Sequence, residues 1–200
     1  MKKVILSCLL AAGLHGAAQA QSSNVSLGLK AGASYATLEG PQSGNPGGRF
    51  GFQAGGFANI GLTDLFAFQP EILYSQKGAK FTNLVANVGP RFNYLDVPLV
   101  FHVNVDGLFF EAGPQVGFLL SAKQYDGNTA TDIKPTTNAV DFGYVAGLGY
   151  QRKRGLGIGL RYNGGLANTP KEQTSGNATV QDKAHNSVFQ LYLTYSFNGR

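Results

Sequence analysis

Three polar residues near the middle of the chain have the side-chain types of a hydrolytic site. Asp96 and His102 fall on the same face of a predicted strand, and Ser121 falls on the strand predicted to lie beside it. A catalytic histidine must touch the carboxylate that orients it. Six residues of extended chain span roughly 20 Å at about 3.3 Å per residue, so Asp96 is too far from His102 to do this. We therefore interpret His102 as a histidine with ordinary polar neighbours and predict that the protein is not an enzyme.

Metal and cofactor sites have no support in the sequence. The three histidines of the chain, His15, His102 and His185, lack the spacing of metal ligands. The glycines at positions 155, 157 and 159 resemble a phosphate-binding turn, but a dinucleotide site needs a helix after its glycines, and a strand is predicted there. We therefore expect no metal and no cofactor.

Isolated charged residues recur on one face of the predicted strands, and this face is otherwise rich in glycine. The residues that we assign to a polar network are Lys30, Glu71, Asp96, Glu111, Lys123 and Arg161, and Lys77 and Asp141 have similar positions. Two interpretations follow from the mixed signs: a polar path for a ligand, or a set of paired charges that fills a closed interior. The choice between them depends on the elements that carry these residues.

The clearest of these elements is a long hairpin from Leu95 to Lys123. Apolar residues recur at every second position in both arms, and the arms meet at Asp106-Gly107, where glycine permits the positive φ of a tight turn. Each arm is about twice the usual strand length of roughly 5–6 residues. A tilted strand that crosses a bilayer needs roughly 9–11 residues, so each arm is long enough to cross one.

Further segments with the same alternation bring the number of predicted strands to eight. They cover residues 25–36, 50–61, 65–77, 141–151, 156–166 and 187–197. Short turns alternate with four long loops, Thr37–Arg49, Gly78–Asn93, Gln124–Val140 and Ala167–Asn186. An even strand number, with short turns on the side of both termini and long loops opposite, is typical of an outer-membrane barrel. The sequence therefore predicts an all-β fold, an eight-stranded antiparallel up-and-down transmembrane β-barrel with both termini periplasmic.

The glycine-rich face indicates which side of the barrel is apolar. In a soluble barrel this face would be solvated and rich in Lys, Glu and Thr, whereas here it is mostly glycine with isolated charges. An eight-stranded barrel has an interior just wide enough for side chains, so glycine makes room where a large group such as Arg161 crosses the axis. We therefore predict apolar side chains outside, against lipid, and a lumen closed by paired charges. A polar ligand path through the lumen is the alternative.

Composition agrees with an exported all-β protein. Only 14% of residues are charged, against roughly 25% in soluble domains, and the chain has 28 glycines. No apolar run reaches the roughly 18 residues of a spanning helix. Lys2 and Lys3 precede an apolar run and then Ala18-Gln19-Ala20, which predicts a cleaved signal peptide over residues 1–20 and a barrel domain over residues 21–200. Cys8, the only cysteine, lies in that signal, so no disulfide is expected.

The net charge excludes one class of partner. Without Lys2 and Lys3, the 16 basic residues become 14 against 11 acidic ones, a net charge of +3. The excess is scattered, and the only basic cluster, Arg152-Lys153-Arg154, is not interleaved with stacking aromatic residues. We therefore expect no nucleic-acid partner.

Several segments resemble the PorT-like outer-membrane β-barrel family of Bacteroidota, small barrels of the OmpX and OmpA kind. The segments are QPEILYSQKGAKF (69–81), YLDVPLVF (94–101), EAGPQVGFLLSAK (111–123), FGYVAGLGYQ (142–151) and LRYNGGL (160–166). The resemblance implies contact with outer-membrane lipid and insertion by the barrel-assembly machinery, which recognises the aromatic end of the last strand. Many barrels end at that aromatic residue, whereas here Asn198-Gly199-Arg200 follow Phe197.

The expected function follows from the long loops. A closed sheet would hold them together at one end, and binding residues commonly lie on loops that a rigid scaffold positions. We therefore predict a structural or surface-binding role for an extracellular ligand or partner whose identity stays open. The alternatives are an accessory role in transport or protein secretion across the outer membrane, and a lipid-modifying barrel hydrolase.

Overall fold

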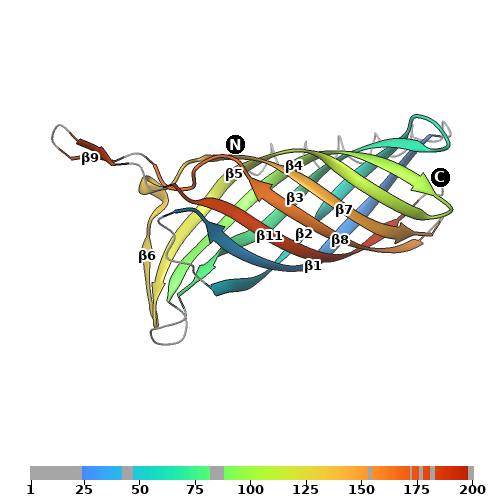
Figure 1. Ribbon diagram of the computed structural model, residues 1–200. Coiled ribbons are helices and arrows are strands. Elements are labelled where there is room, and N and C mark those ends of the chain that lie inside the picture. Colours follow the sequence, from blue (N-terminus) through green and yellow to red (C-terminus); the bar gives the residue numbers. More distant parts are fainter. Residues whose placement is uncertain are drawn as a thin grey trace, which may run out of the picture.

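Eight long strands form a closed antiparallel barrel in the computed structural model, which describes residues 24–41, 47–81, 88–152, 155–171, 173–175, 178–180 and 183–197 (Figure 1). The barrel strands are β1 (Val25–Glu39), β2 (Gly47–Gly61), β3 (Phe66–Lys80), β4 (Gly89–Val105), β5 (Leu108–Asp126), β7 (Val140–Gln151), β8 (Gly155–Gly165) and β11 (His185–Ser196). In the described part of the chain, no helix is long and apolar enough to cross a membrane. The predicted signal peptide, residues 1–20, lies outside the described residues.

Each barrel strand pairs with its neighbours in chain order, and β1 pairs with β11 to close the sheet. The predicted central hairpin is present: Val105 pairs with Leu108 across the turn, and Asp106 and Gly107 have φ values of 48° and 88°. Closure leaves the barrel without the unpaired sheet edges that lipid cannot hydrogen-bond. The predicted eight-stranded up-and-down barrel is therefore confirmed.

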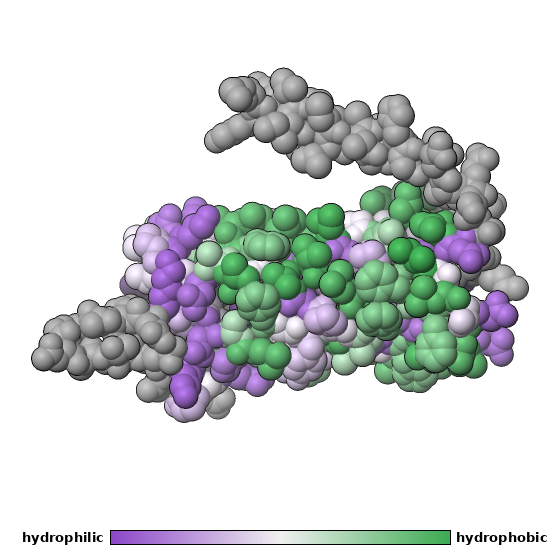
Figure 2. Space-filling view, turned by 90° about the horizontal axis from the view of Figure 1, so that it is seen from above, coloured by the Kyte–Doolittle hydropathy of each residue, from purple (hydrophilic) through white to green (hydrophobic). Residues whose placement is uncertain are grey.

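Apolar side chains cover the outside of the barrel. On β11, Leu191 and Leu193 are exposed while Tyr192 between them is buried, and the same alternation holds on the other barrel strands. Figure 2 shows the result as a band of hydrophobic residues, with hydrophilic residues gathered at the end that carries the long loops. Aromatic pairs lie toward both ends of the band, at ring-centroid distances of 5.0 to 5.5 Å: Tyr35–Phe50, Tyr162–Phe189, Phe68–Phe101 and Tyr195–Phe197. This arrangement, with the apolar face outward as predicted, is that of a membrane barrel with aromatic girdles.

Glycine makes room for large side chains inside the barrel. A Cβ atom on Gly159 would collide with the ring of Tyr192, and one on Gly147 would lie 2.8 Å from Glu111 Oε1. Tyr192 and Glu111 both point inward, so the glycines lie beside the bulkiest groups of the lumen. The glycine-rich second face of the sequence is therefore the crowded inner face of the barrel.

The third long connection is more ordered than the sequence indicated. Residues 124–140 were predicted as a loop, but β5 continues to Asp126 and turns into the short strand β6 (Thr129–Asp132), followed by the 3₁₀ helix η1 (Lys134–Thr136). The β5–β6 hairpin projects beyond the barrel in Figure 1. In the fourth connection, β9 (Gln173–Ser175) and β10 (Ala178–Val180) form a second hairpin. The short strands β6, β9 and β10 have only three or four residues each, most of them polar, so they lack the apolar alternation from which strands were predicted.

A β-bulge places Lys123 on the opposite face of its strand from the one that we predicted. Asn93 of β4 pairs with Ser121, but the next residue, Tyr94, pairs with Leu119, so β5 carries one extra residue at Leu120. An extra residue reverses the inward and outward alternation beyond it. Ala122 is therefore buried and Lys123 is exposed, so the assignment of Lys123 to the lumen was wrong.

Candidate functional site

Arg161 joins two carboxylates from opposite parts of the barrel wall. This residue of β8 donates from Nη1 and Nη2 to both oxygens of Glu71 on β3, at 2.7 and 2.9 Å. It donates from Nε and Nη2 to both oxygens of Glu111 on β5, at 2.6 and 2.7 Å. The planar guanidinium fork fits two bidentate carboxylates, which a lysine ammonium cannot match. Three strands that are not neighbours in the sheet are thereby tied together across the lumen.

Further donors complete the coordination of these two carboxylates. Lys30 Nζ of β1 lies 2.6 Å from Glu71 Oε1, and Gln69 Nε2 donates to the same oxygen at 2.8 Å. Tyr192 of β11 donates its hydroxyl to Glu111 Oε1 at 2.8 Å, and His102 Nε2 lies 3.3 Å from Glu111 Oε2. Buried charges are tolerated where each is paired and hydrogen-bonded. This layer, the central network, contains Lys30, Gln69, Glu71, His102, Glu111, Arg161 and Tyr192.

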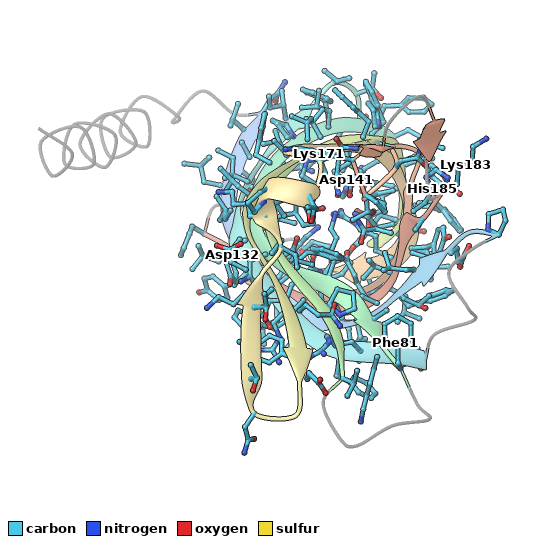
Figure 3. The ribbon with its side chains drawn as sticks, turned by 90° about the vertical axis from the view of Figure 1, so that its left-hand side faces the viewer. Phe81, Asp132, Asp141, Lys171, Lys183 and His185 are labelled. Atoms are coloured by element: carbon cyan, nitrogen blue, oxygen red, sulfur yellow. The ribbon has the colours of Figure 1, made fainter. Side chains whose placement is uncertain are left out.

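A second ionic cluster lies nearer the long-loop end. Lys77 Nζ of β3 is 3.2 Å from Asp96 Oδ1 on β4 and 3.3 Å from Asp141 Oδ2 on β7. Ser75 donates its hydroxyl to Asp96, and Asn186 Nδ2 donates to Asp141 Oδ2 at 3.0 Å. In Figure 3, which looks into the barrel from the end with the long loops, Asp141 lies inside the ring of strands, and Lys171, Lys183 and His185 lie around its rim. The lumen therefore has two separate ionic layers.

Further side chains fill the lumen beyond both ionic layers. Toward the long loops, Phe92, Tyr94, Leu119 and Ala122 form a buried cluster. At the other end, the rings of His102 and Phe109 stack at 4.8 Å, and the polar cavity beside them has a volume of about 10 Å³. That volume holds about one water molecule. At these levels, side chains of the described residues fill the interior of the barrel.

The candidate catalytic residues do not meet. His102 lies against Glu111, Asp96 is bonded to Ser75 and Lys77, and Ser121 accepts a hydrogen bond from Asn93 Nδ2 at 2.7 Å. The carboxylates of the lumen are engaged by cations and hydroxyls, which leaves no arrangement of nucleophile and base among these residues. Within the described residues, no group of three or more His, Cys, Asp or Glu side chains could hold a metal ion.

The structure brings together most of the residues that we assigned to the polar network. Their partners and their division into two layers could not be predicted from the sequence. Lys30, Glu71, Glu111 and Arg161 form one layer, whereas Asp96 belongs to the separate layer around Lys77. Gln69, His102 and Tyr192 were not assigned to the network. All three lie at inward positions of their strands, so strand periodicity could have indicated that they face the lumen.

Comparisons with known proteins agree with this architecture. The sequence model of the family described as outer membrane protein beta-barrel domain matches residues 17–170. The crystal structure of Neisserial surface protein A (NspA) is similar with a TM-score of 0.56 and 12% sequence identity, covering 88% of this chain and 100% of that chain. For Ail, the attachment invasion locus protein of Yersinia pestis, in complex with the heparin analogue sucrose octasulfate, the TM-score is 0.49 and the identity 14%, covering 87% and 99%. No curated protein matches the sequence.

Proposed function

Because the chain belongs to the family of outer membrane protein beta-barrel domains, we propose that it is a closed, non-enzymatic scaffold that presents a binding surface on its long loops. The observation that carries this proposal is the filled lumen, where Arg161 holds Glu71 and Glu111 across the barrel. A barrel without an aqueous path does not conduct solutes. Since the apolar wall faces lipid, the surface left for recognition is the long-loop end.

The bases of the third and fourth connections are joined, which favours a shaped surface over independent loops. Asn138 N donates to Thr169 O at 2.9 Å, and Lys171 N donates to Thr136 O at 3.0 Å. Asn138 Nδ2 donates to Asn168 O at 2.7 Å. Segments far apart in sequence are thus held side by side at the barrel mouth, above the rigid sheet. Loops held in this way are suited to binding because less ordering is required when a partner docks.

We propose that this end is extracellular and that both termini are periplasmic. Small outer-membrane barrels have short periplasmic turns and longer extracellular loops, and the short turns here include Asp106-Gly107. The exposed aromatic residues Tyr195, in β11, and Phe197, directly after it, fit recognition by the barrel-assembly machinery. Within the family, segments such as YLDVPLVF (94–101) support assignment to the PorT-like barrels.

Epitope insertion tests this orientation directly. One variant carries a short tag between Gly127 and Asn128, at the tip of the β5–β6 hairpin, and a matched variant carries the same tag between Asp106 and Gly107. We expect antibody to label intact cells that express the first variant, and to label the second only after the outer membrane is permeabilised. Labelling of intact cells by the second tag alone would show the opposite orientation and would remove the basis for a loop-borne binding surface. Heat-modifiable migration in gels verifies that both variants fold.

The non-enzymatic part of the proposal has its own test. The purified barrel, reconstituted in phosphatidylethanolamine vesicles, is expected to release no fatty acid or lysolipid, and His102→Ala is expected to behave identically. Lipid hydrolysis by the wild-type barrel that disappears in folded His102→Ala would establish the hydrolase alternative instead.

A further inference from the structure

Two arginine side chains lie over one tyrosine ring at the long-loop end of β2, β4 and β5, and a lysine is paired in register with one of them. The guanidinium carbon of Arg91 lies 4.9 Å from the ring centroid of Tyr125, and that of Arg49 lies 5.8 Å from it. Lys123 is paired in register with Arg91 on the neighbouring strand. Arg49 is held in place by two backbone carbonyls, because its Nε donates to Ala79 O at 3.2 Å and its Nη2 to Gly89 O at 3.4 Å. We call Arg49, Arg91, Lys123 and Tyr125 the rim cluster.

The register between β4 and β5 sets the height of the rim cluster above the apolar band. Leu95 pairs with Phe118, and both are exposed apolar residues of the band. The next outward pair is Asn93 with Ser121, which are hydrogen-bonded at 2.7 Å. Beyond it come Arg91 with Lys123, and then Gly89 with Tyr125. At about 3.3 Å per residue, Arg91 lies roughly 13 Å along the strand from Leu95, so the cluster lies beyond this apolar pair toward the long-loop end.

The bulge at Leu120 is what creates this cluster. Without the extra residue, the alternation of β5 would direct Lys123 into the lumen, as its sequence position indicated. With it, Lys123 is exposed and stands opposite Arg91. Like charges directly opposite each other on neighbouring strands repel, and an anion between Arg91 and Lys123 would relieve this repulsion.

Carboxylates of the described residues do not neutralise the rim cluster. Asp132 is opposite Lys123 in the register of β5 and β6, but its Oδ1 accepts a hydrogen bond from Lys134 N, and no ion pair within 4.0 Å joins any described carboxylate to Arg49, Arg91 or Lys123. Asp126 is exposed at the end of β5. Within the described residues, the three positive charges of the cluster therefore have no ion-paired carboxylate and are open to an anion.

We propose that the rim cluster binds a phosphate group of a glycolipid in the outer leaflet of the membrane. Guanidinium groups bind phosphate oxygens through two parallel charge-assisted hydrogen bonds, and a lysine ammonium adds a point charge. The phosphate would lie between Arg91 and Lys123 and remove their mutual repulsion, while the acyl chains lie along the apolar wall below. This inference rests on the proposed orientation, in which the long-loop end faces the outer leaflet.

Lipid binding by the detergent-purified full barrel tests the inference. The probes are bisphosphorylated lipid A, the same lipid with its phosphates removed, and inorganic phosphate, each measured by native mass spectrometry or by a titration that reports tyrosine fluorescence. The test variant is Arg91→Gln with Lys123→Gln. The matched control is Arg152→Gln, which removes a positive charge at the short-turn end of the barrel. Heat-modifiable migration verifies that each variant is folded.

We expect the wild-type barrel to bind the phosphorylated lipid, and the double variant to bind it at least tenfold more weakly, since each cation at a membrane surface contributes about fivefold. The control should bind as the wild type does. Three results would each overturn the proposal: equal binding of the phosphorylated and phosphate-free lipids, equal binding by wild type and double variant, or displacement of the lipid by inorganic phosphate at equal concentration, which would indicate a site for a soluble anion. A wrong orientation would be recognised separately, because the epitope tags report it without any lipid probe.

Discussion

Arg161 and Arg91 lie in the same barrel wall and have opposite surroundings. Arg161 is buried, and it reaches two carboxylates with four hydrogen bonds between 2.6 and 2.9 Å. Arg91 is paired in register with Lys123, lies over the ring of Tyr125, and forms no ion pair with a described carboxylate. The first cation is neutralised by the chain itself, whereas the second has no ion pair within the described residues. Charge inside this barrel therefore ties strands together, and we propose that charge at its rim serves recognition.

The two settings also differ in energy. Removal of one member of a buried ion pair leaves an uncompensated charge and costs about 3–5 kcal/mol, whereas an exposed pair contributes about 0–1 kcal/mol. A substitution inside the lumen should therefore affect stability, and the equivalent substitution at the rim should affect binding. The predictions below test this difference from the largest expected effect to the smallest.

Substitution of Arg161 by Met should have the largest effect on stability. It leaves Glu71 and Glu111 buried without the guanidinium between them, so the free energy of unfolding should fall by about 3–5 kcal/mol. Reversible urea unfolding in lipid vesicles, followed by heat-modifiable migration, measures this change. The triple variant Glu71→Gln, Glu111→Gln and Arg161→Met is the matched control, since removal of all three charges should recover most of the loss. A stability within 1 kcal/mol of wild type for Arg161→Met alone would show that the network does not support the fold.

Substitution of Lys77 by Met should have the next largest effect. Asp96 and Asp141 both approach the Lys77 ammonium, and without it they keep only the donors Ser75 and Asn186. We expect a loss of about 2–3 kcal/mol in the same unfolding assay, less than for Arg161 because these polar donors remain. An effect larger than that of Arg161→Met would place the main stabilising layer at the long-loop end.

Substitution of Gly159 by Ala tests the crowding of the lumen. The new methyl group would collide with the ring of Tyr192 and disturb its hydrogen bond to Glu111. Overpacking of this kind costs about 1–3 kcal/mol. Gly56→Ala is the control, because a Cβ there meets only Gly28 O at 3.5 Å, which is ordinary contact. Equal stabilities for the two variants would contradict the proposed role of glycine on the inner face.

The rim variant, Arg91→Gln with Lys123→Gln, should have the smallest effect on stability. Its side chains are exposed or half-buried and mutually repulsive, so the free energy of unfolding in phosphate-free detergent should stay within about 0.5 kcal/mol of wild type. The same urea titration provides the measurement. A loss comparable to that of Arg161→Met would mean that the rim cluster is structural, and the contrast between the two regions would disappear.

Strand periodicity was sufficient to predict the barrel and most of its inward charges. Lys30, Glu71 and Arg161 each occupy the inward face of an alternating segment, and a period of two fixes that face. The sequence could not assign partners, because contacts across the lumen depend on the stagger of all eight strands. For this reason Asp96 was grouped with Glu71, although it lies in the layer of Lys77.

Lys123 shows where periodicity fails. One extra residue at Leu120 reverses every later position of β5, and no glycine or proline marks the bulge in LLSAK (119–123). The β5–β6 hairpin was missed for a related reason: Thr129–Asp132 is short and polar, so it lacks the apolar alternation of the barrel strands. Both misses lie at the long-loop end, where side chains no longer need to match lipid on one side.

Conductance of the reconstituted barrel in planar bilayers tests the central claim most directly. The central network and the apolar cluster of Phe92, Tyr94, Leu119 and Ala122 fill the lumen at two levels, and we propose that no continuous aqueous path remains. We therefore predict that wild-type barrel, shown to be inserted by heat-modifiable migration of the same sample, produces no conductance above that of the bare bilayer. Large and stable conductance steps from the wild-type barrel would contradict the closed lumen and favour a transport function instead.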